Sequence, residues 1–151
     1  MASTEKIMAY REIGKMLVPG GSVVEFGAAD GKGKILMRSD VYRGIESRDV
    51  YPIPGIDVRR VDISIDNESY PEADTVVCLN AKSYRRRMEF PQVIWRIYET
   101  TKENGSAFIS PIDAEDLPLL FKYYKYVTVY IKSDVSFARC EIPKSLEEVT
   151  Q

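Results

Sequence analysis

The sequence of 151 residues contains no histidine and only two cysteines. Histidine is the commonest general base and a common metal ligand, so its absence excludes Ser-His-Asp and Cys-His catalysis and most zinc sites. The apolar runs all stay well short of the ~18 residues that a membrane-spanning helix needs. The first 15 residues are charged and amphipathic, unlike a secretory signal. We therefore expect neither a metal site nor a membrane partner.

Cys78 and Cys140 both lie in apolar, strand-like runs. Such thiols are usually buried and reduced, which favours a cytoplasmic location. The 44% apolar and 29% charged shares are typical of soluble globular proteins, and a net charge of −2 predicts no general attraction to nucleic acid. The length fits one domain over residues 1–142, with a frayed C-terminal tail over 143–151.

The pattern of apolar residues alternates between strand-like and helix-like stretches along the chain. It predicts helices at 3–17, 32–37, 91–101 and 113–124, and strands at 23–26, 42–46, 57–63, 75–79 and 107–109. Residues 126–132 and 135–142 alternate around Ser133-Asp134 and predict a β-hairpin. The expected fold is α/β, a Rossmann-like, mostly parallel seven-stranded sheet with helices on both faces and a C-terminal antiparallel hairpin.

A glycine-rich turn over residues 27–33 separates the first strand from the following short helix. Glycine and alanine let the backbone approach a ligand closely, and a helix N-terminus presents free N–H groups. The second strand ends on Glu46, and a carboxylate about 20 residues beyond such a turn can accept both ribose hydroxyls. This stretch therefore predicts a nucleotide-binding unit.

The sequence of residues 24–31, VEFGAADG, resembles the first motif of class I S-adenosylmethionine-dependent methyltransferases. Ala29 departs from the family, which usually has a glycine there, and its methyl group narrows the space beside the methionine part of the cofactor. Residues 44–47 and 93–110 resemble the family's second-strand ending and its helix, turn and fifth strand, and the antiparallel last strand also matches. A dinucleotide fingerprint fits worse, because Lys32 stands where its third glycine belongs.

The resemblance implies S-adenosylmethionine as cofactor and a set of contacts at the strand ends. The implied cofactor-binding residues are Glu25, Gly27, Ala28, Ala29, Asp30, Gly31, Glu46, Ser47, Asp62 and Ile63. Glu25 would anchor the turn and reach the cofactor's amino group through water; alternatively, it is a strand-end acid held by turn amides. Asp30 could favour the helix start without touching any ligand.

Methyl transfer is a direct displacement, so the protein mainly aligns the acceptor. At the end of the fourth strand, Asn80 could accept a hydrogen bond from a substrate N–H, and Tyr84 could cover a flat substrate. The simpler alternative is a capping asparagine and a surface tyrosine. The segment lacks the family's amino-methylating signature. The lysine-aspartate-lysine-glutamate set of the ribose 2′-O-methyltransferases is also incomplete. Asn80 stands at the position of its aspartate, and Ser110 stands near the position of one of its lysines.

Four cations, Lys82, Arg85, Arg86 and Arg87, fall within six residues just before a predicted helix. Such a run is usually a solvated face, but positive charge is disfavoured at a helix start. An anionic substrate or partner, such as a phosphate, an RNA or an acidic protein, is therefore a second interpretation.

These observations predict an S-adenosylmethionine-dependent methyltransferase with an unidentified acceptor, which is anionic under the second interpretation of the basic run. The alternative is a catalytically weak or inactive binding or regulatory subunit on the same scaffold, and a nicotinamide-dependent oxidoreductase comes third. The short chain leaves acceptor selection to the basic loop, to a partner protein, or to a homo- or hetero-oligomer. In the implied sheet order, Cys78 and Cys140 lie on non-neighbouring strands, so we expect no disulfide.

Overall fold

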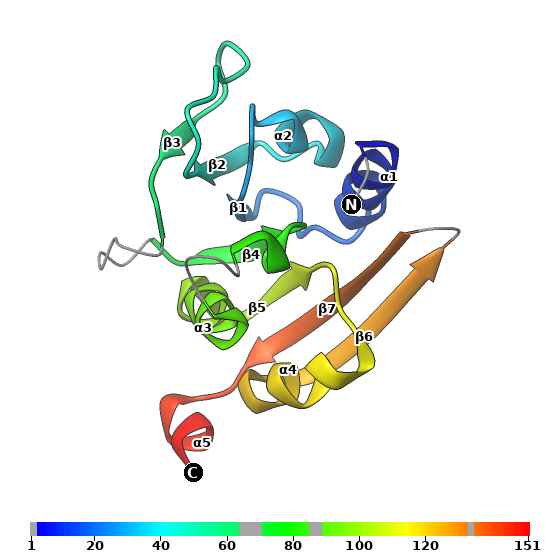
Figure 1. The fold of residues 1–151 in the computed structure, drawn as a ribbon, viewed down its shortest axis with the longest axis vertical. Helices are drawn as coiled ribbons and strands as arrows, with labels where there is room; N and C mark the ends of the chain where they lie inside the picture. Colours follow the sequence, from blue (N-terminus) through cyan, green and yellow to red (C-terminus); the bar gives the residue numbers. More distant parts are fainter. Residues whose placement is uncertain (1–2, 64–70, 85–88, 133–134) are drawn as a thin grey trace.

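The structure is a computed structural model that describes residues 3–63, 71–84, 89–132 and 135–151. One seven-stranded sheet runs through these residues in the order β3-β2-β1-β4-β5-β7-β6 (Figure 1). Its strands are β1 (Ser22–Phe26), β2 (Val41–Glu46), β3 (Val58–Arg60), β4 (Ala73–Cys78), β5 (Thr101–Ile109), β6 (Tyr124–Lys132) and β7 (Val135–Pro143). The helices are α1 (Ser3–Gly14), α2 (Lys32–Met37), α3 (Phe90–Thr100), α4 (Leu117–Tyr123) and α5 (Leu146–Thr150), with 3-10 turns η1 (Ala81–Tyr84) and η2 (Ala114–Asp116).

The strand directions confirm the predicted fold class. Strands β1 to β5 pair in parallel, whereas β7 pairs antiparallel with both β5 and β6. Parallel neighbours need crossover connections, and α2 and α3 supply two of them. The carboxyl ends of β1, β2 and β4 therefore meet at one edge of the sheet.

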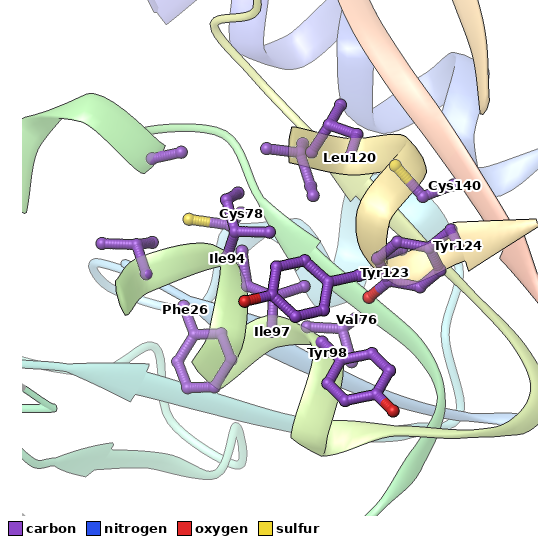
Figure 2. Close-up of a cluster of buried hydrophobic side chains, with 14 of the residues drawn as sticks. Phe26, Val76, Cys78, Ile94, Ile97, Tyr98, Leu120, Tyr123, Tyr124 and Cys140 are labelled. Atoms are coloured by element: carbon purple, nitrogen blue, oxygen red, sulfur yellow. The ribbon is translucent and has the colours of Figure 1, made fainter. Parts of the chain in front are cut away.

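Helices cover both faces of the sheet, with α1 and α2 on one side and α3 and α4 on the other (Figure 1). Val93, Ile94 and Ile97 of α3 are fully buried, because their spacing puts them on one face of the helix. Figure 2 shows this face packed against aromatic rings, where Tyr98 and Tyr123 lie 5.0 Å apart between ring centroids. Each such aliphatic side chain contributes about 1.5–3 kcal/mol when it leaves water.

Both cysteines are free and buried, as predicted. Cys78 lies on β4 and Cys140 on β7, and β5 separates the two strands. Burial raises the pKa of each thiol to about 12, so neither is a reactive thiolate at neutral pH. In the described part of the chain, no helix is long and apolar enough to cross a membrane.

Several predicted boundaries were wrong for identifiable reasons. Strand β5 begins at Thr101, well before residue 107, because Asn104 adopts a positive φ of 64° and a register shift lets the strand continue through it. The helix predicted at 113–124 divides into η2 and α4, and Tyr124 already belongs to β6. The third strand is shorter than 57–63, and α1 ends before residue 17.

The C-terminal segment is helical, although fraying was expected. Ser145 caps α5, since its Oγ accepts from the Glu148 N–H at 3.3 Å and its own N–H donates to Glu148 Oε1 at 3.2 Å. This reciprocal capping, together with the burial of Val149 in the core, holds the short helix against the α3 side of the sheet. The predicted hairpin turn, Ser133-Asp134, lies outside the described residues.

Candidate cofactor site

The carboxyl edge of the sheet has a topological switch point at β1. This strand pairs with β2 on one side and β4 on the other, so the connections leave it in opposite directions. In open α/β sheets, ligands bind in the crevice outside the strand ends at such a point. Gly27 follows β1 and Asn80 follows β4, which places both predicted segments at this crevice.

The glycine-rich turn is held against the end of β2. The N–H groups of Gly27 and Ala28 both donate to the Ile45 carbonyl oxygen, at 2.8 and 3.1 Å. Gly27 has a φ of 72°, and a Cβ built on it would lie 2.2 Å from Asn80 Oδ1. Only glycine combines this conformation with such close packing. The turn is therefore fixed between two strand ends.

Ala29 has a φ of 51°, in the left-handed region that glycine prefers. The family that the sequence resembles usually has glycine at this position, and the backbone keeps a glycine-like conformation although the residue carries a methyl group. A non-glycine residue in this region costs about 1–2 kcal/mol.

Glu46 ends β2 and lies beside the turn. Its Oε1 accepts from the Ala29 N–H at 2.9 Å, so the turn and the strand-end carboxylate are in direct contact. Its Oε2 accepts from the Arg48 N–H at 3.0 Å. Burial acts to raise the pKa of this carboxyl, but the hydrogen bonds from Arg48 and Ala29 outweigh it and hold the pKa below its usual value.

Glu25 of β1 lies in a cluster with two phenols. Its carboxylate accepts hydrogen bonds from the hydroxyl groups of Tyr10 on α1 and Tyr42 on β2, the latter at 2.5 Å. The hydrogen-bond donors to this carboxylate are therefore phenols. The second interpretation of Glu25, a strand-end acid held by turn amides, predicted backbone N–H donors instead. Glu25 is only 1% exposed; burial raises its pKa to about 7, and the two phenol hydrogen bonds oppose that rise.

The other predicted cofactor residues gather at the same edge. Asp30 Oδ1 accepts from the Lys32 N–H at 3.1 Å, which stabilises the start of α2. A Cβ on Gly31 would lie 2.6 Å from Ile56 Cγ2, so the turn also packs on the segment before β3. The Val61 N–H donates to the Glu46 carbonyl oxygen at 2.8 Å, which brings the following residues to this edge. The residues next in sequence to these contacts are Ser47, half-buried, Asp62, also half-buried, and Ile63, buried.

The predicted acceptor-binding residues have different surroundings. Asn80 is half-buried beside Gly27, and Tyr84 ends η1, with its side chain outside the described residues. Lys82 is paired within the protein, because its Nζ lies 2.8 Å from Asp113 Oδ2 and 2.7 Å from Asp116 Oδ2. These hydrogen bonds raise the pKa of Lys82 and tie η1 to η2. The other three cations of the run, Arg85, Arg86 and Arg87, lie outside the described residues.

Sequence reasoning missed Arg48, the two phenols around Glu25 and the two aspartates around Lys82. Only Arg48 had a local signal, since it follows the predicted ribose carboxylate by two residues. Tyr10 and Tyr42 are 15 and 17 residues from Glu25, and Asp113 is 31 residues from Lys82, so the folded chain was needed to join them.

A separate hollow of about 560 Å³ lies at the opposite edge of the sheet. It is lined by Trp95, Tyr98 and the chain from Ile142 to Leu146, near the starts of β5 and β6 and the end of β7. We place the candidate site at the carboxyl edge instead, because the switch point, the tight turn and the buried carboxylate coincide there. Among the described residues, no group of three or more Cys, Asp and Glu side chains could hold a metal ion.

No protein-family model and no curated protein sequence matches the chain significantly. Solved structures do match it over nearly its whole length. A TehB-like S-adenosylmethionine-dependent methyltransferase from Corynebacterium glutamicum is 14% identical, with a TM-score of 0.67 over 89% of this chain and 86% of that one. The chain has the class I methyltransferase fold.

Two further structures with this fold have different acceptors in their names. A tRNA methyltransferase from Aquifex aeolicus is 9% identical, with a TM-score of 0.68 over 96% of this chain and 70% of that one. The magnesium protoporphyrin IX methyltransferase from Synechocystis, solved with bound S-adenosylmethionine, is 12% identical, with a TM-score of 0.64 over 94% of this chain and 81% of that one. At these identities the class I methyltransferase fold is shared and the acceptor is not specified.

Proposed function

We propose that this protein binds S-adenosylmethionine at the carboxyl edge and transfers its methyl group to an acceptor. The observation that carries the proposal is the hydrogen bond of 2.9 Å from the Ala29 N–H to Glu46 Oε1. It joins a tight small-residue turn to a buried strand-end carboxylate at the switch point of a parallel sheet, where nucleotide ligands bind.

The residues present fit an adenosyl ligand. Glu46 would accept the ribose hydroxyls, the turn from Gly27 to Gly31 would hold the methionine part, and Ser47, Asp62 and Ile63 would contact the rest of the adenosine. When bound, the cofactor supplies an electrophilic methyl group on a sulfonium. Asn80, which packs on Gly27 at the start of the turn, would accept a hydrogen bond from an acceptor N–H and orient it for in-line attack, and Tyr84 would cover the acceptor.

The acceptor that we propose is anionic, for example an RNA, a phosphate-bearing molecule or an acidic protein. The support is the run Arg85, Arg86 and Arg87, which follows Asn80 by five to seven residues in the sequence. Lys82 supports it less, because two aspartates already neutralise it. We also propose a cytoplasmic location, on the two buried unpaired thiols, and acceptor selection through a homo- or hetero-oligomeric partner.

A second candidate function is a binding or regulatory subunit that has lost most of its catalysis. Two observations favour it: Ala29 keeps a strained left-handed conformation, and Arg48 already donates hydrogen bonds to the ribose carboxylate. Such a protein would bind S-adenosylmethionine or its demethylated product but would not transfer the methyl group.

Calorimetry with S-adenosylmethionine, S-adenosylhomocysteine and NAD tests the proposal. We expect binding of both adenosyl ligands, no binding of NAD, and affinity at least ~10-fold weaker in Glu46→Gln, because a hydrogen bond to a charged group contributes about 1.5–3 kcal/mol. Transfer of a radiolabelled methyl group to RNA or protein fractions separates the two candidates: binding without transfer supports the regulatory subunit. Absence of binding by the wild-type protein would refute both.

A further inference from the structure

The carboxylate of Glu46 is saturated by N–H donors from the protein itself. Oε1 accepts from Ala29 N at 2.9 Å and Arg48 Nη2 at 3.2 Å, and Oε2 accepts from Arg48 N at 3.0 Å and Arg48 Nε at 3.2 Å. A carboxylate offers about four lone-pair sites. A ribose diol therefore has no acceptor position on Glu46 until one of these donors leaves.

The donor that can leave is the guanidinium group. The Glu46 side chain is 4% exposed and the Ala29 and Arg48 N–H groups belong to the backbone, whereas the Arg48 side chain is 67% exposed. Its Nε and Nη2 approach the two carboxylate oxygens as a fork, in the manner that two neighbouring hydroxyl groups would. Rotation of this exposed side chain frees one position on each oxygen without moving the backbone.

We propose that Arg48 is a positioning residue of the cofactor site, which occupies the ribose-binding positions of Glu46 and is displaced only by a ligand with both ribose hydroxyls. The inference rests on the proposed function and adds a competitor within the chain. Arg48 keeps the buried carboxylate hydrogen-bonded in the free protein, and it lowers the affinity for ligands that need those positions. A ligand without the diol has no hydroxyl groups to donate to Glu46, so Arg48 stays bound to the carboxylate.

The test compares adenosine with 2′,3′-dideoxyadenosine, which differ only in the diol, by calorimetry on wild type and three variants. Arg48→Met keeps the apolar stem and removes the donors, and Arg48→Lys restores a single cation. The matched control is Arg60→Met, because Arg60 is an exposed arginine that pairs with Asp49 at 4.0 Å. We expect Arg48→Met to bind adenosine roughly two- to fivefold more tightly, a change of the size measured for ion pairs near the surface, because the Arg48 partner is exposed.

The same variant should leave the affinity for dideoxyadenosine unchanged; Arg48→Lys should be intermediate, and Arg60→Met should match wild type. Equal gains for both ligands would overturn the inference, because Arg48 would then act by bulk or charge and not through the oxygens of Glu46. Unchanged or weaker adenosine binding in Arg48→Met would overturn it as well.

Failure of the inference can be told from failure of the proposed function. If wild type binds adenosine and Arg48→Met brings no gain, only the inference fails. If no variant binds adenosine although wild type binds S-adenosylmethionine, again only the inference fails; if wild type binds neither, the proposed function fails and the inference with it. Carbon NMR titration of Glu46 adds a readout without ligand: loss of the Arg48 donors should raise the pKa of this carboxyl, and an unchanged value would show that the pair does not form in solution.

Discussion

The side-chain amide of Asn80 packs directly against the α-carbon of Gly27. A Cβ on Gly27 would lie 2.2 Å from Asn80 Oδ1 and 2.3 Å from Nδ2, although the two residues follow different strands. The contact closes the switch-point crevice between β1 and β4 to any side chain at position 27. It also fixes the amide that we propose orients the acceptor.

Gly27→Ala should therefore destabilise the protein by more than its backbone conformation alone explains. Gly20 is a matched control, because its φ of 73° is nearly that of Gly27 at 72° while nothing lies within 4 Å of an added Cβ. We expect Gly20→Ala to cost about 1 kcal/mol from strain and Gly27→Ala roughly 2–4 kcal/mol from strain plus overlap. Urea unfolding measures both, and equal costs would contradict the packing of Asn80 on Gly27.

Adding Asn80→Ala to Gly27→Ala should restore part of the lost stability, because the overlapping amide is gone. The double variant should then differ from Asn80→Ala by about the cost of Gly20→Ala, near 1 kcal/mol. Additive losses from the two substitutions would mean that Asn80 and position 27 do not contact each other.

Ala29→Gly should stabilise the protein. Ala29 has a φ of 51°, which glycine adopts without steric cost. Glycine also makes the unfolded chain more flexible, which opposes folding, so we expect a net gain in the free energy of unfolding of about 0.5–1 kcal/mol. The neighbouring Ala28→Gly should have the opposite sign, because Ala28 is buried and its Cβ packs near Gly44. Thermal unfolding of the two variants checks the signs, and a loss in Ala29→Gly would refute the proposed strain.

Local patterns predicted the sheet and the turn, but not the partners of the site residues. The buried face of α3 follows from residues spaced three and four apart, and the turn from closely placed glycines and alanines. Glu25 was predicted at the end of β1, but its contacts with Tyr10 and Tyr42 depend on how α1 and β2 pack on β1. Long-range packing of this kind has no periodic signal in the sequence.

The ion-pair partners of Lys82 could not be predicted from the sequence either. In sequence it belongs to a cationic run, whereas in the fold η2 brings Asp113 and Asp116 to it. A double-mutant cycle with Lys82→Met and Asp116→Asn should give a coupling of roughly 0.5–1 kcal/mol, the upper range for pairs near the surface. The cycle with Asp113→Asn should give less, since Asp113 is more exposed than Asp116. Zero coupling in both cycles would return Lys82 to the set of cations available to an anionic acceptor.

The buried Glu25 cluster should make stability depend on pH. Burial raises the pKa of Glu25 from 4.5 to about 7 in the folded protein. Between these values the unfolded chain has lost a proton that the folded protein keeps, so the contribution of Glu25 to stability is largest below pH 4.5 and falls as pH rises to about 7. Glu25→Gln keeps the shape without the titration, so the stability of wild type relative to this variant should fall by on the order of 2–3 kcal/mol across that window.

Urea unfolding of both proteins at pH 4.5, 6 and 8 measures the difference, and the other carboxyl groups cancel in the comparison. Tyr42→Phe adds a directional check. Its hydroxyl group donates to Glu25 Oε1 and so favours the ionised form, and its removal should raise the pKa of Glu25 further and move the loss of stability to higher pH. A constant difference between wild type and Glu25→Gln would mean that Glu25 ionises in the fold as it does in the unfolded chain.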